Sequence, residues 1–449
     1  MTSVPTTPQS QPMPNTISLD LLFRQRFIFF SSYSPSTSRE KKHPSKNTKA
    51  WGFDAGVLNA NNEETLVNSP SGCNTWQNWR SEFPVTETYI YMNHAGVAPL
   101  SRRVRDAMAG FMEDATFHGA VHADDWAETA EICRTRAARL INADATEVAF
   151  MKNTTQGILI AANGIDWQAG DNVVTTAVEF PANVYPWWSL KERYGVNTRM
   201  VPERDGCIYI EDIAAAMDAR TRVLTISHVE FASGFRNDIE ALGALCRERD
   251  IWFVVDAIQS LGVVEVDVKL CNVDILAADG HKWLLAPEGA ALFYCADARR
   301  EQLINTNIGW AGVVNPRDFL NYDLTQKPDA TRFEEGSYNS VGLYGLSAAI
   351  DLLHDIGIPG IEARVLELTA HLIDGLQAKG YRVLTPKTDS ERAGIVIFES
   401  ERHTPAEIYE LLHTENIITA ERGNGVRVSP HFYNTTSEIE RLLEVLPEV

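Results

Sequence analysis

The chain reads DILAADGHKW at residues 274–283, a short apolar run followed at once by a His-Lys pair. Residues 274–277 are predicted to form a strand, and Lys282 comes just after its end, among apolar neighbours. Burial disfavours an ammonium ion, so the pKa of such a lysine falls and its neutral amine becomes a nucleophile for Schiff-base formation. The alternative is a lysine whose stem packs on apolar surface while its ammonium reaches water. This stretch alone leaves both interpretations open.

Short β-branched runs like the one at 274–277 recur along the middle of the chain and alternate with helical patterns. This repeated order predicts an α/β fold with a mostly parallel seven-stranded sheet, covered on both faces, whose ligands bind at the carboxyl ends of the strands. The other six strands are predicted at 147–151, 172–176, 197–201, 222–227, 251–256 and 290–294. Helices are predicted between strands at 156–163, 185–194, 210–216 and 239–249.

Composition divides the chain into three predicted parts. Residues 1–75 are predicted to be a disordered or dispensable extension, because the first 50 residues hold 21 Ser, Thr or Pro and little apolar surface. Residues 76–335 are predicted to form a large domain, with 76–100 packing against the small one. Residues 336–449 are predicted to form a small α+β C-terminal domain, with helices at 343–356, 361–379, 405–415 and 438–446 and strands near 381–384 and 395–398.

Charge and cysteine usage exclude several classes of protein. The chain has 40 Lys or Arg against 60 Asp or Glu, a net charge of −20, which disfavours binding to nucleic-acid phosphate. It contains no run of about 18 apolar residues, so no membrane partner is predicted. Its six cysteines form no CxxC pair, which indicates a reduced, cytoplasmic location and no metal site. Dinucleotide, P-loop, zinc-protease and GxSxG patterns are also missing.

Two further segments place polar groups at predicted strand ends. Asp256 ends an apolar strand 26 residues before Lys282, where a carboxylate suits the protonated ring nitrogen of pyridoxal phosphate (PLP). Residues 152–157, KNTTQG, open a helix after the strand at 147–151, and free N–H groups and hydroxyls at such a point form an anion site. The alternative in both cases is ordinary helix capping.

Together these segments resemble the class V aminotransferase family of fold-type-I PLP enzymes, which includes cysteine desulfurases, isopenicillin N epimerase and related C–S lyases. The resemblance covers about residues 89–446. The segments that carry it are YMNHAG at 91–96, NTT at 153–155, EFPAN at 179–183, DAIQ at 256–259, GHK at 280–282, FEEGSYN at 333–339 and RVSP at 427–430.

The resemblance implies that PLP is the cofactor and that Lys282 binds it covalently and then shuttles the substrate's α-proton. By the same resemblance, Asp256 pairs with the pyridine nitrogen and Gln259 with the phenolic oxygen. These roles would make Lys282 and Asp256 the catalytic residues.

The resemblance assigns the remaining site residues in the same way. The phosphate would be held by Thr154, Thr155 and His281, together with Ser337 and Asn339 of a second chain, which implies a homodimer. Phe180 would stack on the cofactor ring, and Arg427 would clamp the substrate carboxylate with a bidentate fork. His94 is assigned to substrate binding.

Departures from the family pattern bear on the activity. Cysteine desulfurases carry a nucleophilic cysteine shortly before the carboxylate-binding arginine, but residues 417–427 contain none, so sulfur transfer of that type is disfavoured. The ring-stacking position is commonly histidine in the desulfurases, whereas Phe180 can only stack. Asp279 stands where a serine is common and is expected to point away from the phosphate, and Arg422 is interpreted as a solvated loop arginine.

Several reactions at the α-carbon of an amino acid remain open: transamination, isopenicillin-N-epimerase-like epimerisation and C–S lysis. An alternative from another class is a non-catalytic PLP-binding protein. The combination of Lys282, Asp256 and Arg427 argues against it, because a pure binder needs no clamp for a substrate carboxylate.

Overall fold

The structure is a computed structural model that describes residues 76–449. These residues belong to one compact unit. The predicted N-terminal extension at 1–75 lies outside the described residues.

A seven-stranded sheet forms the centre of the fold, and its strand order is β2-β8-β7-β6-β5-β3-β4. Strand β8 runs antiparallel to both of its neighbours, and all other pairs are parallel. The prediction of a mostly parallel, seven-stranded sheet is therefore confirmed. The strands are β2 Val148–Met151, β3 Asn172–Thr176, β4 Asn197–Val201, β5 Thr221–Ser227, β6 Trp252–Asp256, β7 Ile275–Asp279 and β8 Ala291–Cys295.

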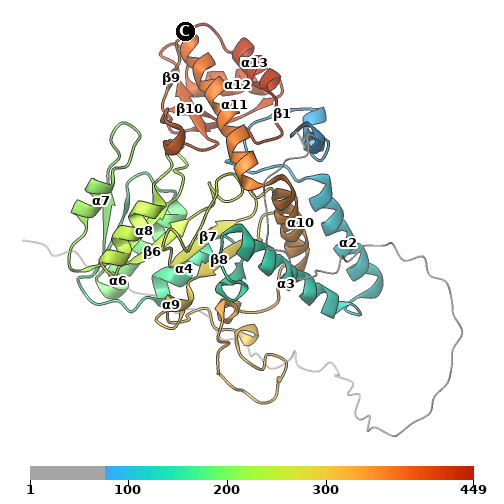
Figure 1. The fold of residues 1–449 in the computed structure, drawn as a ribbon, viewed down its shortest axis with the longest axis vertical. Coiled ribbons are helices and arrows are strands. Elements are labelled where there is room, and N and C mark those ends of the chain that lie inside the picture. Colours follow the sequence, from blue (N-terminus) through green and yellow to red (C-terminus); the bar gives the residue numbers. More distant parts are fainter. Residues whose placement is uncertain (1–75) are drawn as a thin grey trace, which may run out of the picture. The chain divides into compact units, whose positions relative to one another are not determined.

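Helices cover both faces of this sheet (Figure 1). Because side chains alternate along a strand, β7 sends Leu276 and Ala278 into one apolar core and Ile275 and Ala277 into another. Helices α3, α8 and α10 contribute to the first core, and α4 and α5 to the second. The described helices are α1 Trp76–Arg80, α2 Arg102–His118, α3 Ala123–Leu140, α4 Thr154–Gly164, α5 Tyr185–Trp188, α6 Leu190–Tyr194, α7 Ile210–Ala216, α8 Ile239–Glu248, α9 Asp297–Arg300, α10 Ser340–Ile356, α11 Ile358–Ala378, α12 Pro405–Thr414 and α13 Thr436–Val445.

One predicted helix, 185–194, is wrong as a single element. It is divided into α5 and α6 at Ser189, the residue that ends the first helix and begins the second. Pro186 sits in the first turn of α5, where its missing N–H costs nothing. The sequence pattern shows the apolar periodicity of both halves but not the break between them.

A second sheet lies near the carboxyl end of the chain, with strand order β12-β13-β10-β9. Helix α11 and strands β10 and β13 surround a separate apolar core that also takes in Met92. A short parallel pair, β1 with β11, joins the segment around residue 90 to this region, and Figure 1 shows β1 beside these later elements. The division into domains at residue 335 stays a prediction. The strands are β1 Ile90–Tyr91, β9 Arg382–Val383, β10 Val396–Glu399, β11 Ile417–Ile418, β12 Ala420–Arg422 and β13 Gly425–Val428.

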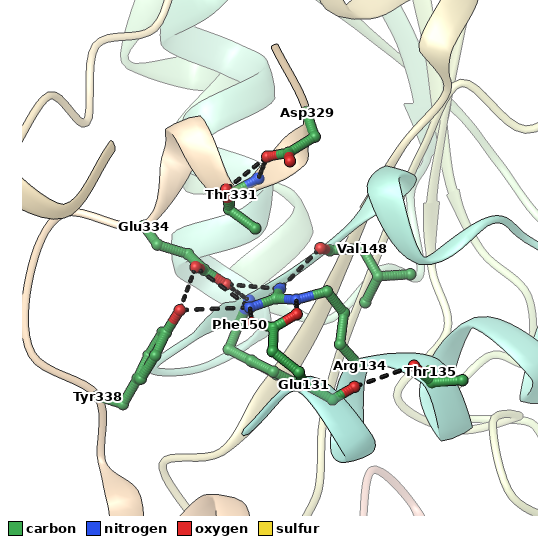
Figure 2. Close-up of polar contacts among 9 residues, drawn as sticks. All are labelled: Glu131, Arg134, Thr135, Val148, Phe150, Asp329, Thr331, Glu334 and Tyr338. Atoms are coloured by element: carbon green, nitrogen blue, oxygen red, sulfur yellow. Dashed lines mark hydrogen bonds and ion pairs between the residues drawn. The ribbon is translucent and has the colours of Figure 1, made fainter. Parts of the chain in front are cut away.

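A buried ion pair between Arg134 of α3 and Glu334 ties three distant parts of the chain together (Figure 2). Arg134 Nη1 donates to Glu334 Oε1 at 2.8 Å and to the Val148 carbonyl at 2.8 Å. The same Oε1 accepts the Phe150 N–H at 2.9 Å, and the Tyr338 hydroxyl donates to the other carboxylate oxygen at 2.6 Å. Both charges are thus neutralised and hydrogen-bonded, which a buried pair requires.

Among residues 76–449, no single helix has the length and apolar composition needed to cross a membrane. Helices α10 and α11 meet that test only together, and they are bent by 79° where they join. The five cysteines in the described part are all free. A cytoplasmic location stays a prediction.

We predict that Arg134→Met destabilises the protein by about 3–5 kcal/mol, because it leaves the Glu334 carboxylate buried without its countercharge. The measurement is urea denaturation followed by circular dichroism. Arg317→Met is the control, since its pair with Asp124 is 3.5 Å long and both side chains are more than 80% exposed. Equal denaturation midpoints for the two variants would show that the buried pair does not support the fold.

Candidate active site

A cavity of about 310 Å³ opens where the carboxyl ends of the central strands face the second sheet, within the roughly 300–1,000 Å³ range of small-molecule sites. Most of the predicted site residues meet in its wall. The side chains and backbone that line it belong to Ala95, Gly96, Asn153, Thr154, Thr155, Phe180, Ala182, Phe231, Asp256, Ile258, Gln259, Asp279, His281, Lys282, Arg422 and Arg427.

Lys282 and Asp256 provide the opposite charges of this cavity. Burial lowers the pKa of the Lys282 ammonium to about 8, and the nearby Asp256 carboxylate works against that shift. Burial raises the pKa of Asp256 to about 6, opposed by the Ile258 N–H and by Lys282. The Lys282 Nζ lies 5.6 Å from the centre of the Phe180 ring. The amine therefore stands beside an aromatic wall in a partly neutral state near neutral pH.

The hydrogen bonding of Asp256 fits a cationic ring nitrogen. Its side chain is 2% exposed, and one carboxylate oxygen accepts the Ile258 N–H at 3.0 Å. The other oxygen, Oδ2, is buried without a hydrogen-bond partner among the described residues. A buried carboxylate oxygen left without a donor is costly, so this atom is suited to the protonated pyridine nitrogen of PLP.

The predicted phosphate-binding end of the cavity is built around the start of α4. Asn153 caps this helix by accepting the Gln156 N–H at 3.0 Å, and Thr154 and Thr155 begin its first turn. Gly157 lets the helix lie close against β7, since a Cβ there would be 2.7 Å from the Ala277 Cβ. Free N–H groups and hydroxyls therefore face the cavity, as an anion site requires.

Asp279, whose side chain is predicted to point away from the phosphate, is buried beside His281. It lines the cavity, and its Oδ2 lies 3.1 Å from Nδ1 of His281. Its other oxygen accepts the Gly280 N–H at 2.8 Å, and its own N–H donates to the Thr154 hydroxyl at 3.0 Å. The Gly280 N–H therefore compensates part of the negative charge, and the Asp279 carboxylate lies beside the His281 ring.

Gln259 lines the cavity with its side-chain amide held at both ends. The Trp283 indole N–H donates to Oε1 at 2.9 Å, and Nε2 donates to the Ala95 carbonyl at 3.1 Å. One Nε2 hydrogen is left for a further acceptor, since the amide group has two. This hydrogen is the group that the predicted contact with the phenolic oxygen needs.

Two arginines line the side of the cavity formed by the second sheet. Arg427 lies on β13, is 1% exposed, and has an Nε without a partner among the described residues. Burial lowers its pKa to about 9, and the charge of Arg422 adds to that shift. The prediction of a loop position for Arg422 is wrong, because this residue ends strand β12. Its side chain is exposed, as expected, and lines the cavity. Two guanidinium groups thus face the space beside Lys282.

His94 does not line the cavity. It is fully buried, its Nδ1 is 2.8 Å from the Ser429 carbonyl, and its Nε2 is 2.6 Å from the Tyr433 hydroxyl. Burial lowers its pKa to about 4, so the ring is neutral. With both nitrogens engaged inside the protein, His94 positions the loop at 429–433, and we leave it out of the proposed substrate site.

Ser337 and Asn339 also lie outside the Lys282 cavity of their own chain and line a separate, smaller one. Asn339 caps α10 by accepting the Gly342 N–H at 3.2 Å and donates to the Gly289 carbonyl at 3.0 Å. The predicted role of both residues in a second chain's phosphate site stays a prediction.

Phe231 is a site residue that the sequence did not single out. Its ring meets Phe180 edge to face, with centroids 5.3 Å apart, and both rings line the cavity. The available signal was its position shortly after β5, at the edge of the sheet where ligands bind. The structure adds it to the aromatic wall.

Comparison with known proteins agrees with this geometry. The sequence profile of the family described as "Aminotransferase class-V" matches residues 90–442. The chain belongs to the class V aminotransferase family. A relative named "Probable cysteine desulfurase" from Methanothermobacter thermautotrophicus is 32% identical over 402 residues, covering 82% of this chain and 97% of that protein.

Solved structures show the same fold. The apo structure of a cysteine desulfurase from Thermococcus onnurineus NA1 matches with a TM-score of 0.75 at 26% identity, covering 82% of this chain and 96% of that one. A variant of C-DES with glycine covalently linked to its PLP cofactor matches with a TM-score of 0.77 at 22% identity, covering 81% and 98%. The class V member described here is a PLP-dependent enzyme of fold type I, as predicted.

We predict that the rate at which the apoprotein binds PLP covalently rises with pH through about 8, because the neutral Lys282 amine is the reactive form. Asp256→Asn removes the negative charge that favours the Lys282 ammonium. The pKa of Lys282 therefore falls, and the pH profile of the rate moves to lower pH. Stopped-flow absorbance at the band of the bound cofactor measures both profiles. Lys282→Ala is the control and should give no band, and a profile unchanged in Asp256→Asn would contradict the proposed interaction.

Proposed function

We propose that the protein cleaves the C–S bond of a cysteine-type amino acid by β-elimination and releases the sulfur group to solvent. The observation that supports this proposal is a cavity in which Lys282, Asp256 and Arg427 meet but which no described cysteine lines. Lys282, Asp256 and Arg427 serve chemistry at the α-carbon of an amino acid. The names of the desulfurase relatives suggest a substrate that contains sulfur.

The chain's own residues bind the substrate and transfer its protons, and PLP supplies the electron sink. Arg427 holds the substrate carboxylate by a bidentate fork, which orients the α-hydrogen. Lys282, whose pKa is about 8, accepts the α-proton and can return a proton to the departing sulfur. PLP, when bound, stabilises negative charge at the α-carbon, and Asp256 holds its ring nitrogen protonated.

The absence of a thiol separates this proposal from desulfurase-type sulfur transfer. Of the five cysteines in the described part, none lines the cavity, and four are buried. Burial raises the pKa of Cys271 to about 11, and the pKa values of Cys133, Cys246 and Cys295 are raised further. All four thiols are therefore poor nucleophiles. The segment before Arg427 is instead a β12-β13 hairpin turning at Gly423 and Asn424.

Arg422 favours substrates that carry a second anionic group. Its guanidinium faces the same cavity as Arg427, and its side chain has one hydrogen bond among the described residues, a 2.7 Å contact from Nη1 to the Glu421 carbonyl. A substrate with a second anionic group would use both arginines. Cystine and carboxylated cysteine thioethers have this chemistry, and we expect them to be better substrates than cysteine.

We predict that the holoenzyme converts L-cysteine or L-cystine into pyruvate and ammonia, with the sulfur product formed in equal amount. Arg427→Ala should lose most of the turnover, and Arg422→Ala should raise KM for cystine more than for cysteine. Product analysis by mass spectrometry and a pyruvate assay provide the measurement. Lys282→Ala is the inactive control.

Other products would identify other reactions. Alanine with a protein-bound persulfide would indicate a desulfurase. Conversion of the cofactor to its pyridoxamine form would indicate a transaminase, and exchange of the α-hydrogen without a keto acid would indicate an epimerase. Binding of PLP with no response to any amino acid would support the non-catalytic alternative.

We also propose that two chains form a homodimer in which Ser337 completes the phosphate site of the other chain. Its absence from the cavity of its own chain supports this arrangement. Large apolar side chains at 319–324 are strongly exposed, including Leu320 at 94% and Tyr322 at 96%, and a second chain would cover them.

The shared site can be tested by subunit complementation. Ser337→Ala should weaken PLP binding about tenfold or more, since it removes a hydrogen bond to a charged group. In a mixed dimer, one chain carries Ser337→Ala and the other carries Lys282→Ala. The site with the intact Lys282 then receives the intact Ser337 of the other chain, so this site should bind PLP tightly again. Spectroscopic titration of co-expressed, doubly tagged dimers measures this affinity. No recovery in the mixed dimer, or a monomer by light scattering, would contradict the proposal.

A further inference from the structure

A cluster of Asp114, His118 and His122 lies at the corner between α2 and α3, outside the Lys282 cavity. Asp114 and His118 are four residues apart and so share one face of α2. Helix α2 ends at Gly119, whose φ of 59° reverses the chain, and His122 is the residue that precedes α3. Two helix ends therefore bring three ligating side chains to one point.

The distances within this cluster are short enough for a shared ion. The carboxylate oxygen Oδ1 of Asp114 lies 2.9 Å from Nδ1 of His118 and 2.6 Å from Nδ1 of His122. One ligand atom of each residue lies within 4.8 Å of the other two. Each side chain is also partly exposed, the two imidazoles at 52% and 42%, so an ion can enter directly from solvent.

The type of ligands selects the ion. Two imidazoles and one carboxylate suit borderline divalent ions such as Zn²⁺, whereas Mg²⁺ and Ca²⁺ prefer oxygen ligands alone. Three protein ligands leave a coordination position for water. Without an ion, Oδ1 of Asp114 lies at hydrogen-bond distance from Nδ1 of both imidazoles. An ion bound by these atoms takes the place of the hydrogen bonds, and each neutral imidazole then carries its proton on Nε2.

Trp126 gives the carboxylate a fixed orientation. Its indole N–H donates to the other oxygen of Asp114, Oδ2, at 2.8 Å, which leaves Oδ1 directed toward the two imidazoles. The indole packs against Phe111, with ring centroids 5.0 Å apart, and Phe111 in turn contacts Tyr344 of α10. Metal-ligating carboxylates are typically held by such outer hydrogen bonds.

We propose that Asp114, His118 and His122 form a surface site for one divalent ion of the Zn²⁺ type. The ion joins the end of α2 to the start of α3. Both helices pack against α10, and Figure 1 shows the three together. The site is a cross-link of this helical layer, and it stabilises the native state because the unfolded chain does not hold the three ligands together.

The test is calorimetric titration of the chelator-treated, full-length holoenzyme with Zn²⁺. Wild type should bind one more ion per chain than His118→Ala/His122→Ala, and its thermal midpoint should rise with Zn²⁺ while that of the variant does not. His371→Ala is the matched control, since this histidine is 43% exposed and pairs, within residues 76–449, with a single carboxylate, that of Glu440 at 3.9 Å. The His371→Ala variant should bind as many Zn²⁺ ions per chain as wild type.

Trp126→Phe tests the supporting hydrogen bond separately. It should keep the stoichiometry but weaken Zn²⁺ binding about tenfold or more, as expected for loss of an outer hydrogen bond. Circular dichroism and the cofactor band verify that each variant is folded. Equal stoichiometry and affinity in wild type and the double histidine variant would overturn the proposal, as would a wild type that takes up no Zn²⁺ in the titration.

Discussion

The buried pair of Arg134 and Glu334 holds together the parts of the chain that lead into the start of α4 and into α10. It joins α3, strand β2 and the segment that leads to α10, three regions separated by up to 200 residues. Strand β2 runs directly into the capped start of α4, and residues 334–339 run into α10. If either charge were alone in this core, its desolvation would disfavour the arrangement of all three.

A second constraint acts at the edge of the sheet, where polar groups must sit beside apolar strands. Burial shifts the pKa values of Lys282 and Asp256 toward each other, one to about 8 and the other to about 6. Their opposite charges limit those shifts, and the Phe180 and Phe231 rings beside them help keep the amine from water. Reactivity and packing therefore have the same origin, which is the low polarity of the end of the sheet.

Much of the fold and of the site could be predicted from the sequence because both depend on local patterns. Six of the seven strands are almost wholly buried, and only the edge strand β4 is partly exposed. Apolar runs mark most of these strands in the sequence, and residues that follow β2, β3, β5, β6 and β7 lie together in the cavity. Contacts made across the fold had no such signal. The pairing of His94 with Tyr433, the pairing of Asp279 with His281 and the convergence of His118 with His122 depend on the folded chain or on a turn whose geometry the pattern does not specify.

The position of β8 in the sheet also bears on how the chain reaches its native state. Strand β2 pairs only with β8, and β8 separates it from β7. The start of α4, at residue 154, and Lys282 therefore cannot be locked into register until residues 291–295 have been synthesised and inserted between them. During translation, β2 therefore stays unpaired while β3 to β7 can already associate. Pairing over such a separation is slow, and an unpaired apolar strand can pair wrongly, so the order of the strands exposes the nascent chain to mispairing during this interval.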